Sequence, residues 1–178
     1  KGLEDESFAA YDSCLQWKDD NVAALNNYAY YISLKGKELH KAEQMSFKTI
    51  KAEPKNGTYL DTYAWILFME ERYHEAKIYI DQAIANLDST QNNNTVIEHA
   101  GDIYAMNGLT EEALKFWKQS YDAGNKSEGI MTKIKNKRYI TEEEIKRMTG
   151  GSAVTPDRKS QSRSGAKKNN KLRNGKKK

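Results

Sequence analysis

The side chains that most often carry catalysis or bind metals are few in this chain and lie far apart. The histidines are His40, His74 and His99, and the single cysteine is Cys14. A metal site needs two or more such ligands at a spacing that brings them together, and this pattern does not provide one. Nothing in the sequence argues for Cys14 as a nucleophile, and its place in a column of small residues predicts a packing role. We therefore predict no metal site, no cofactor and no catalytic residue.

Two further motifs could in principle carry catalysis or bind a ligand, but each has a structural explanation. The acidic triplet Glu142–Glu144 follows Thr141 and is typical of the first turn of a helix, where acidic side chains are favourable. The glycines Gly57, Gly101 and Gly108 do not form a phosphate-binding loop and are expected in helix packing or turns instead. The sequence therefore does not predict an enzyme, and function must come from a surface.

That surface is built on helices, because apolar residues recur with helical spacing over residues 57–88. Leu60, Tyr63, Ala64 and Leu67 lie at i, i+3, i+4 and i+7 and predict one apolar stripe. A second stripe follows a polar break, and its members are Ala76, Tyr79, Ile80, Ala83, Ile84 and Leu87. Small residues in both stripes predict that the two helices approach closely and pack as a pair.

The same pair occurs in two further copies. The first-helix stripe recurs upstream at Leu25, Tyr28, Ala29 and Ile32, and downstream at Ile97, Ala100, Gly101 and Tyr104. The second helices align on Ala42, Ala76 and Ala113, which are 34 and 37 residues apart. The three additional residues fall in the polar run 89–94, where a loop can lengthen at little cost. Recurrence at this period is typical of a repeat protein.

These copies resemble the tetratricopeptide repeat, a helix–turn–helix unit of 34 residues. The resemblance implies an all-α, right-handed α-solenoid of tetratricopeptide helix–turn–helix repeats with a C-terminal capping helix. Ile130, Met131, Ile134 and Tyr139–Ile140 form a further amphipathic stripe, and basic residues on its other face predict the capping helix. The expected domain covers residues 1–149, divided into a half repeat (1–21), three repeats (about 22–56, 57–93 and 94–125) and capping helices (126–149).

The half repeat at residues 1–21 matches a second helix whose first helix is missing. We therefore interpret the chain as the C-terminal part of a longer protein, and we expect self-association through its open end. No run of residues is long and apolar enough to cross a membrane. The repeats resemble those of bacterial multi-repeat proteins, including envelope lipoproteins. This resemblance favours the periplasmic side of the bacterial envelope over the cytoplasm, while the residues themselves leave the compartment undecided.

In this family, the first helices of successive repeats line a concave groove that binds peptides or partner helices. Aromatic residues in the middle and carboxylates at one end would suit a peptide with apolar anchors and a basic flank. An alternative for Trp65 and Phe68 is packing against the second helix of a neighbouring repeat. The residues placed in the groove by the resemblance are Asn26, Tyr30, Asp61, Trp65, Phe68, Met69, Glu98, Asp102 and Met106. We therefore predict a protein- or peptide-binding scaffold.

One use of the family can be argued against. Members that hold a C-terminal carboxylate present Lys, Arg and Asn at fixed groove positions. The corresponding residues here are Asn26, Tyr30, Thr62, Thr95 and His99. No cation is expected in the groove, so the sequence does not predict this carboxylate clamp.

Residues 150–178 differ in composition from the rest of the chain. They contain ten Lys or Arg and one Asp, and too few apolar residues to form a core, so we predict a disordered basic tail. Its cations, including Lys167, Lys168, Lys171 and Arg173, could hold nucleic acid or an anionic membrane surface, which is the alternative function. The tail has no aromatic residue for base stacking, which favours a solvating extension. It could also reach the carboxylates predicted in the groove.

Overall fold

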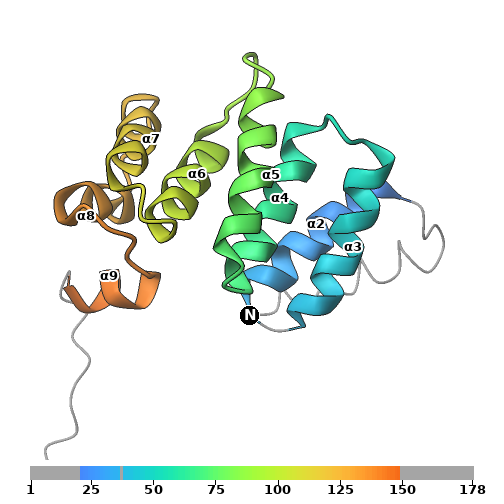
Figure 1. Ribbon diagram of the computed structural model, residues 1–178. Coiled ribbons are helices and arrows are strands. Elements are labelled where there is room, and N and C mark those ends of the chain that lie inside the picture. Colours follow the sequence, from blue (N-terminus) through green and yellow to red (C-terminus); the bar gives the residue numbers. More distant parts are fainter. Residues whose placement is uncertain (1–20, 37, 149–178) are drawn as a thin grey trace, which may run out of the picture.

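The computed structural model describes residues 21–36 and 38–148, and it is entirely helical over these ranges (Figure 1). The helices are α2 (Val22–Leu34), α3 (Leu39–Ala52), α4 (Gly57–Met69), α5 (Tyr73–Ala85), α6 (Asn94–Met106), α7 (Thr110–Asp122), α8 (Glu128–Asn136) and α9 (Glu142–Met148). The predicted half repeat, its open end and the basic tail with Lys167, Lys168, Lys171 and Arg173 lie outside the described residues.

Consecutive helices pack as pairs, α2 with α3, α4 with α5, and α6 with α7. The pairs stack side by side, because α3 packs on α4 and α5 packs on α6. The first helices also contact one another, α2 with α4 and α4 with α6, while α8 packs on α7 and α9 on α8 (Figure 1). The predicted all-α solenoid with a C-terminal capping helix is confirmed.

Small residues lie where the helices of a pair come closest. Ala64 of α4 and Ala76 and Ala83 of α5 are completely buried, and the same is true of Ala42 and Ala113 in the neighbouring pairs. Larger apolar residues of the same core cluster, including Leu60, Leu67 and Ile80, are buried around the alanines of α4 and α5. The small alanine side chains therefore allow the two helices of each pair to approach closely.

The close packing of α6 against α7 requires a glycine in α6. A Cβ atom on Gly101 would lie 2.3 Å from the indole ring of Trp117 in α7. Trp117 is completely buried, and its Nε1–H donates to Asp102 Oδ1 at 2.9 Å. The packing role predicted for Gly101 is confirmed: the missing side chain makes room for the largest side chain of the adjacent helix.

In the last two helices, the structure confirms one prediction and contradicts another. The Glu144 N–H donates to Thr141 Oγ1 and the Thr141 N–H donates to Glu144 Oε2, which confirms the predicted helix start as a capping box. In α8, however, Met131 is 45% exposed and Lys133 only 6%. The expectation of Met131 inside and the basic residues outside was wrong for these two positions, because carboxylates of α6 draw Lys133 inward.

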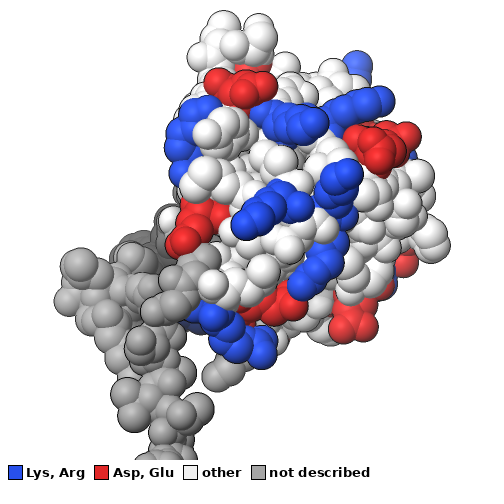
Figure 2. Space-filling model, turned by 90° about the vertical axis from the view of Figure 1, so that its left-hand side faces the viewer, with Lys and Arg blue, Asp and Glu red and all other residues white. Residues whose placement is uncertain are grey.

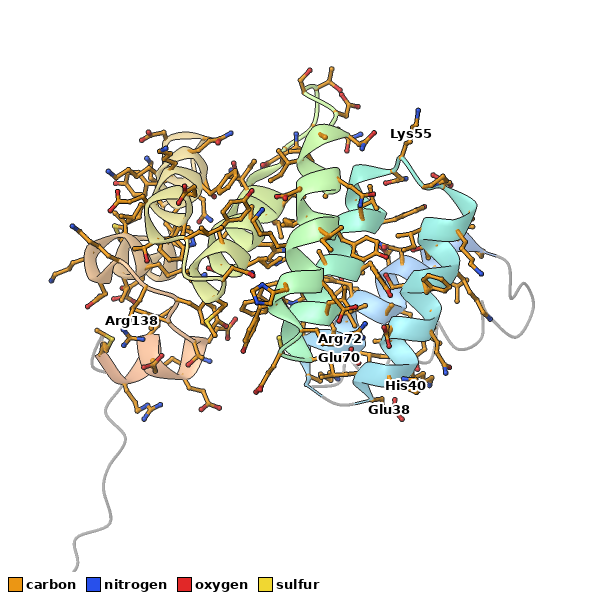
Figure 3. All side chains as sticks on the ribbon, in the orientation of Figure 1. Glu38, His40, Lys55, Glu70, Arg72 and Arg138 are labelled. Atoms are coloured by element: carbon orange, nitrogen blue, oxygen red, sulfur yellow. The ribbon has the colours of Figure 1, made fainter. Side chains whose placement is uncertain are left out.

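A charged cluster joins two repeats at one end of the helices. The Arg72 guanidinium, at the turn between α4 and α5, contacts Glu43 of α3 at 2.7 Å, Glu70 at 2.9 Å and Glu75 at 2.7 Å. Glu43 also accepts from the Tyr63 hydroxyl at 3.3 Å. Figure 3 shows Glu70 and Arg72 at the same end of the repeats as Glu38 and His40. This cluster stabilises the junction between the α2–α3 and α4–α5 pairs.

Candidate functional site

The first helices and the C-terminal helices enclose a cavity of about 520 Å³. Helices α2, α4 and α6 form one side, while α8, α9 and the segment between them form the other. Its lining includes Tyr30, Leu34, Trp65, Glu98, His99, Asp102, Lys133, Tyr139, Ile140 and Ile145. The cavity therefore lies on the side of the solenoid where the sequence placed the groove.

The nine predicted groove residues do not all reach this cavity. Four of them line it: Tyr30, Trp65, Glu98 and Asp102. The other five do not line it: Asn26, Asp61 and Phe68 are buried, Met69 packs against the core, and Met106 is partly exposed. The predicted groove residues therefore fall into two groups, one that packs inside the solenoid and one that lies on its surface.

Trp65 lies at the centre of an aromatic stack. Its indole is stacked with His99 of α6, with ring centroids 4.0 Å apart, and with Phe68 of its own helix at 4.8 Å. The alternative prediction placed Trp65 against the second helix of a neighbouring repeat. This stack does not show that contact, because α6 is a first helix. Trp65 Nε1 is buried and has no hydrogen-bond partner among the described residues, an arrangement that costs free energy.

His99 and Asp61 form a buried pair that was not predicted from the sequence. His99 Nδ1 lies 2.9 Å from Asp61 Oδ1 and 3.2 Å from Asp61 Oδ2. Burial alone would lower the pKa of His99, but the charge of Asp61 and its hydrogen bond outweigh burial and raise that pKa above 6.5. A signal was present, because Asp61 and Glu98 occupy equivalent repeat positions and His99 directly follows Glu98.

A second buried cluster surrounds the Lys133 ammonium group. Its Nζ lies 2.8 Å from Glu98 Oε1 and 2.7 Å from Asp102 Oδ2. Asn125 also donates to Glu98 Oε2 at 2.6 Å. Burial would lower the pKa of Lys133, but the charges of Asp102 and Glu98 outweigh it and raise the pKa, so the ammonium is charged.

Lys133 corrects two expectations. The groove was expected to contain no cation, yet Lys133 lines the cavity. The carboxylates expected to meet the basic flank of a ligand are already paired within the chain, Asp61 by His99 and both Glu98 and Asp102 by Lys133. The structure therefore gives no support to a groove whose free carboxylates attract a basic peptide or the basic tail.

The segment between α8 and α9 also reaches the groove. Helix α8 ends at Asn136, and the positive φ of 54° at the next residue, Lys137, turns the chain. The Tyr139 ring then packs edge-on against Phe68 of α4, with centroids 5.2 Å apart, and Ile140 is 1% exposed. Sequence reasoning placed these two residues in a capping stripe and did not anticipate contact with α4, two repeats earlier in the stack.

Stacked antiparallel helix pairs with small residues at their closest contacts define an α-solenoid. Comparison with solved structures identifies its repeats as the tetratricopeptide type. The first such domain of human RPAP3, solved by NMR, superposes with a TM-score of 0.57 at 16% identity, covering 65% of this chain and 88% of that one. The crystal structure of MamA gives a TM-score of 0.58 at 15% identity, covering 73% and 74%.

The crystal structure of TTC0263, a protein with these repeats from Thermus thermophilus, gives a TM-score of 0.61 at 12% identity, covering 76% of this chain and 73% of that one. Similarity at these identities establishes the fold, and it confirms the resemblance derived from the repeat pattern. No family model and no curated protein matches the chain.

Over residues 21–36 and 38–148, the structure contains no group of three His, Cys, Asp or Glu side chains placed to hold a metal ion. None of the helices in the same ranges has the length and apolar character needed to span a membrane.

Proposed function

We propose that this chain is a protein- or peptide-binding scaffold that uses the concave side of its repeats, without catalysis. The observation that carries the proposal is the cavity of about 520 Å³ between the first helices and the C-terminal segment. Its volume lies within the range of roughly 300–1,000 Å³ that is typical of ligand pockets. The fold supports the proposal, because solenoids of this kind present extended concave surfaces.

The walls of the cavity favour an apolar anchor over a charged one. Tyr30, Leu34, Trp65 and Ile145 contribute aromatic and aliphatic surface, whereas the carboxylates of Glu98 and Asp102 are already paired with Lys133. A few side chains in well-packed, desolvated pockets supply most of the binding energy in protein interfaces, and Trp and Tyr are enriched among them. A partner would therefore bind mainly through one or two large apolar residues.

Two exposed aliphatic residues allow a matched test. Leu34 lines the cavity and is 48% exposed, whereas Ile78 on α5 is 58% exposed and does not line it. Peptides selected from a random displayed library on the immobilised chain would be measured by calorimetry against Leu34→Asp and Ile78→Asp. We expect Leu34→Asp to weaken binding at least tenfold and Ile78→Asp to leave it unchanged. Equal effects of the two substitutions would contradict the use of this groove.

A second candidate function is association with nucleic acid or an anionic membrane surface. Figure 2 shows Lys and Arg side chains across the middle of the end face formed by the C-terminal helices, with Asp and Glu mostly around its edge. The exposed cations on α7 and α8 and in their connections include Lys115, Lys118, Lys126 and Lys135. The basic residues 150–178 follow these helices in the sequence and would add to the same attraction.

The two candidates differ in their dependence on salt and on the tail. Binding of a labelled single-stranded oligonucleotide, or of vesicles with anionic lipids, should weaken steeply between about 50 and 300 mM salt and be lost on deletion of residues 152–178. Peptide binding in an apolar cavity should change little under both conditions.

Oligomeric state and location also belong to the proposal. The resemblance to bacterial multi-repeat proteins favours the cell envelope, and the half repeat at residues 1–21 favours self-association. Fractionation of cells that express this protein tests the first, and light scattering over a range of concentrations tests the second. Recovery in the cytoplasm, or a monomer at every concentration, would contradict the respective part.

A further inference from the structure

The segment Lys137–Thr141, here called the return segment, crosses the concave side of the solenoid. A capping helix such as α8 covers the last repeat and needs no further contact to do so. The chain nevertheless turns at Lys137 and brings Tyr139 against Phe68 of α4, while Ile140 is almost completely buried. Tyr139 packs against the same core cluster as Trp65 and Phe68. The return segment therefore occupies part of the surface that the repeats present to a ligand.

The attachment beyond Ile140 is weak. Helix α9 has no buried residue, and α8 is the helix against which it packs. The Arg138–Glu144 pair, at 3.2 Å, is solvent-exposed, as is the Lys146–Glu142 pair at 3.6 Å. Exposed pairs of this kind contribute little to stability. Figure 3 shows Arg138 beside α9, on the outside of the molecule.

The return segment does not fill the space beneath it. Tyr139 and Ile140 line the cavity together with Glu142, Ile145 and Lys146 of α9, so the cavity continues under this helix. The return segment is anchored by two apolar side chains, is held elsewhere by exposed ion pairs, and lies over an open cavity. It is therefore suited to being displaced by a ligand.

We propose that the return segment is an internal competitor for the groove, and that the partner is a peptide carrying an aromatic residue followed by a branched aliphatic one. This inference rests on the proposed function and specifies its ligand. The partner's aromatic side chain takes the place of Tyr139 against Phe68, and its aliphatic side chain takes the place of Ile140. Lys133 keeps its contacts with Glu98 and Asp102, so α8 remains in place when the return segment leaves.

The chemistry of the internal segment identifies the ligand class. Phe68 receives the edge of an aromatic ring, at an interplanar angle of 85°, and the Lys133 ammonium lies 5.6 Å from the same Tyr139 ring. An aromatic ring at this place therefore gains both a ring–ring and a cation–π contact. A side chain without an aromatic ring would gain neither of these contacts.

The test uses the full chain and a labelled peptide with the sequence of residues 133–143, KIKNKRYITEE. Fluorescence anisotropy would give its affinity for the unsubstituted chain and for the double variant Tyr139→Ala, Ile140→Ala. We expect at least tenfold tighter binding by the variant, because its own segment no longer competes. A peptide with alanine at the positions of Tyr139 and Ile140 should not bind. Met131→Ala, at an exposed position of α8, is the control and should behave as the unsubstituted chain.

A second variant keeps the proposal testable if the first variant does not fold. Arg138→Ala with Glu144→Gln removes an exposed ion pair and no apolar contact, so the repeats should remain folded by circular dichroism. It should bind the probe about two- to fivefold more tightly than the unsubstituted chain. The indole N–H signal of Trp65, assigned with Trp65→Phe, should shift on probe binding in both variants.

The outcomes separate this inference from the proposed function. Folded variants that bind the probe no better than the unsubstituted chain would overturn the internal competitor, even if displayed peptides still bind and respond to Leu34→Asp. Binding of the alanine peptide as tightly as the probe would overturn the aromatic–aliphatic ligand. Dimers formed by exchange of the return segment would also overturn it, because the segment would then serve a second copy of the chain.

Discussion

Lys133 of α8 lies 2.7 Å from Asp102 of α6, and both side chains are almost completely buried. The ammonium also contacts Glu98, so one cation is shared by two carboxylates of the preceding first helix. Trp117 adds a hydrogen bond to Asp102 from α7. This cluster joins three helices, and it connects the last complete repeat to its cap.

The first prediction concerns this cluster. Lys133→Ala should lower the free energy of unfolding by about 3–5 kcal/mol, because it leaves buried carboxylates without their counter-ion. Lys135→Ala, at an exposed position on the same helix, should change it by less than about 0.5 kcal/mol. Urea unfolding followed by circular dichroism measures both. Similar values for the two variants would show that Lys133 does not hold the cap.

The second prediction concerns the pH dependence of the His99–Asp61 pair. Asp61 raises the pKa of His99 in the folded chain above its unfolded value of 6.5. The pair therefore contributes its full stability below about pH 6.5 and loses it as pH rises through the folded pKa. The stability lost in His99→Asn should be larger at about pH 6 than at about pH 9, as measured by urea unfolding.

The control for this pH effect is His40→Asn, since His40 is exposed on α3. Its stability difference from the unsubstituted chain should be small at both pH values. A destabilisation by His99→Asn that is constant or grows with pH would contradict a charged His99.

The third prediction uses two glycines in helices. Gly101→Ala should destabilise the chain by about 1–3 kcal/mol, because the added methyl group overlaps the Trp117 ring. Gly129→Ala in α8 meets the end of the Ile145 side chain at 3.3 Å and Ser127 Oγ at 3.9 Å. It should be neutral or stabilise by about 0.5–1 kcal/mol through helix propensity. Thermal unfolding of both variants tests the contrast, and destabilisation of equal size would refute it.

The fourth prediction addresses the contact between paired helices. Ala64→Leu and Ala76→Leu should each destabilise by about 1–3 kcal/mol, because a completely buried alanine has no room for additional carbons. Ala85→Leu, at the exposed end of α5, should have little effect. If circular dichroism melts of all three coincide with the parent, the helix pairing in the fold is wrong.

The fold could be predicted because it depends on local periodicity. Alanines at Ala42, Ala76 and Ala113 recur at the repeat period, and each lies at a helix contact, so spacing alone locates the pairs. The capping box of Thr141 and Glu144 is similarly local, since its two partners are three residues apart. The contacts that these residues make lie within one helix pair or one helix turn. They can therefore be predicted without knowing how the repeats pack on one another.

The site could be predicted only in part, because its key contacts connect different repeats. Periodicity places Met131 beside Ile130 and Ile134, yet it says nothing about the carboxylates of α6 that draw Lys133 inward. In the same way, the turn at Lys137 decides that Tyr139 meets Phe68, and a positive φ at a lysine has no sequence signature.

The shared cation at Lys133 limits how the number of repeats can change. A further helix pair inserted between α7 and α8 would separate Lys133 from Glu98 and Asp102. Both carboxylates would then face the new first helix in an apolar environment, where an unpaired charge is strongly unfavourable. A longer array therefore requires a cation on the inserted first helix that lies next to α6, at the position facing these carboxylates, or neutral residues in place of Glu98 and Asp102.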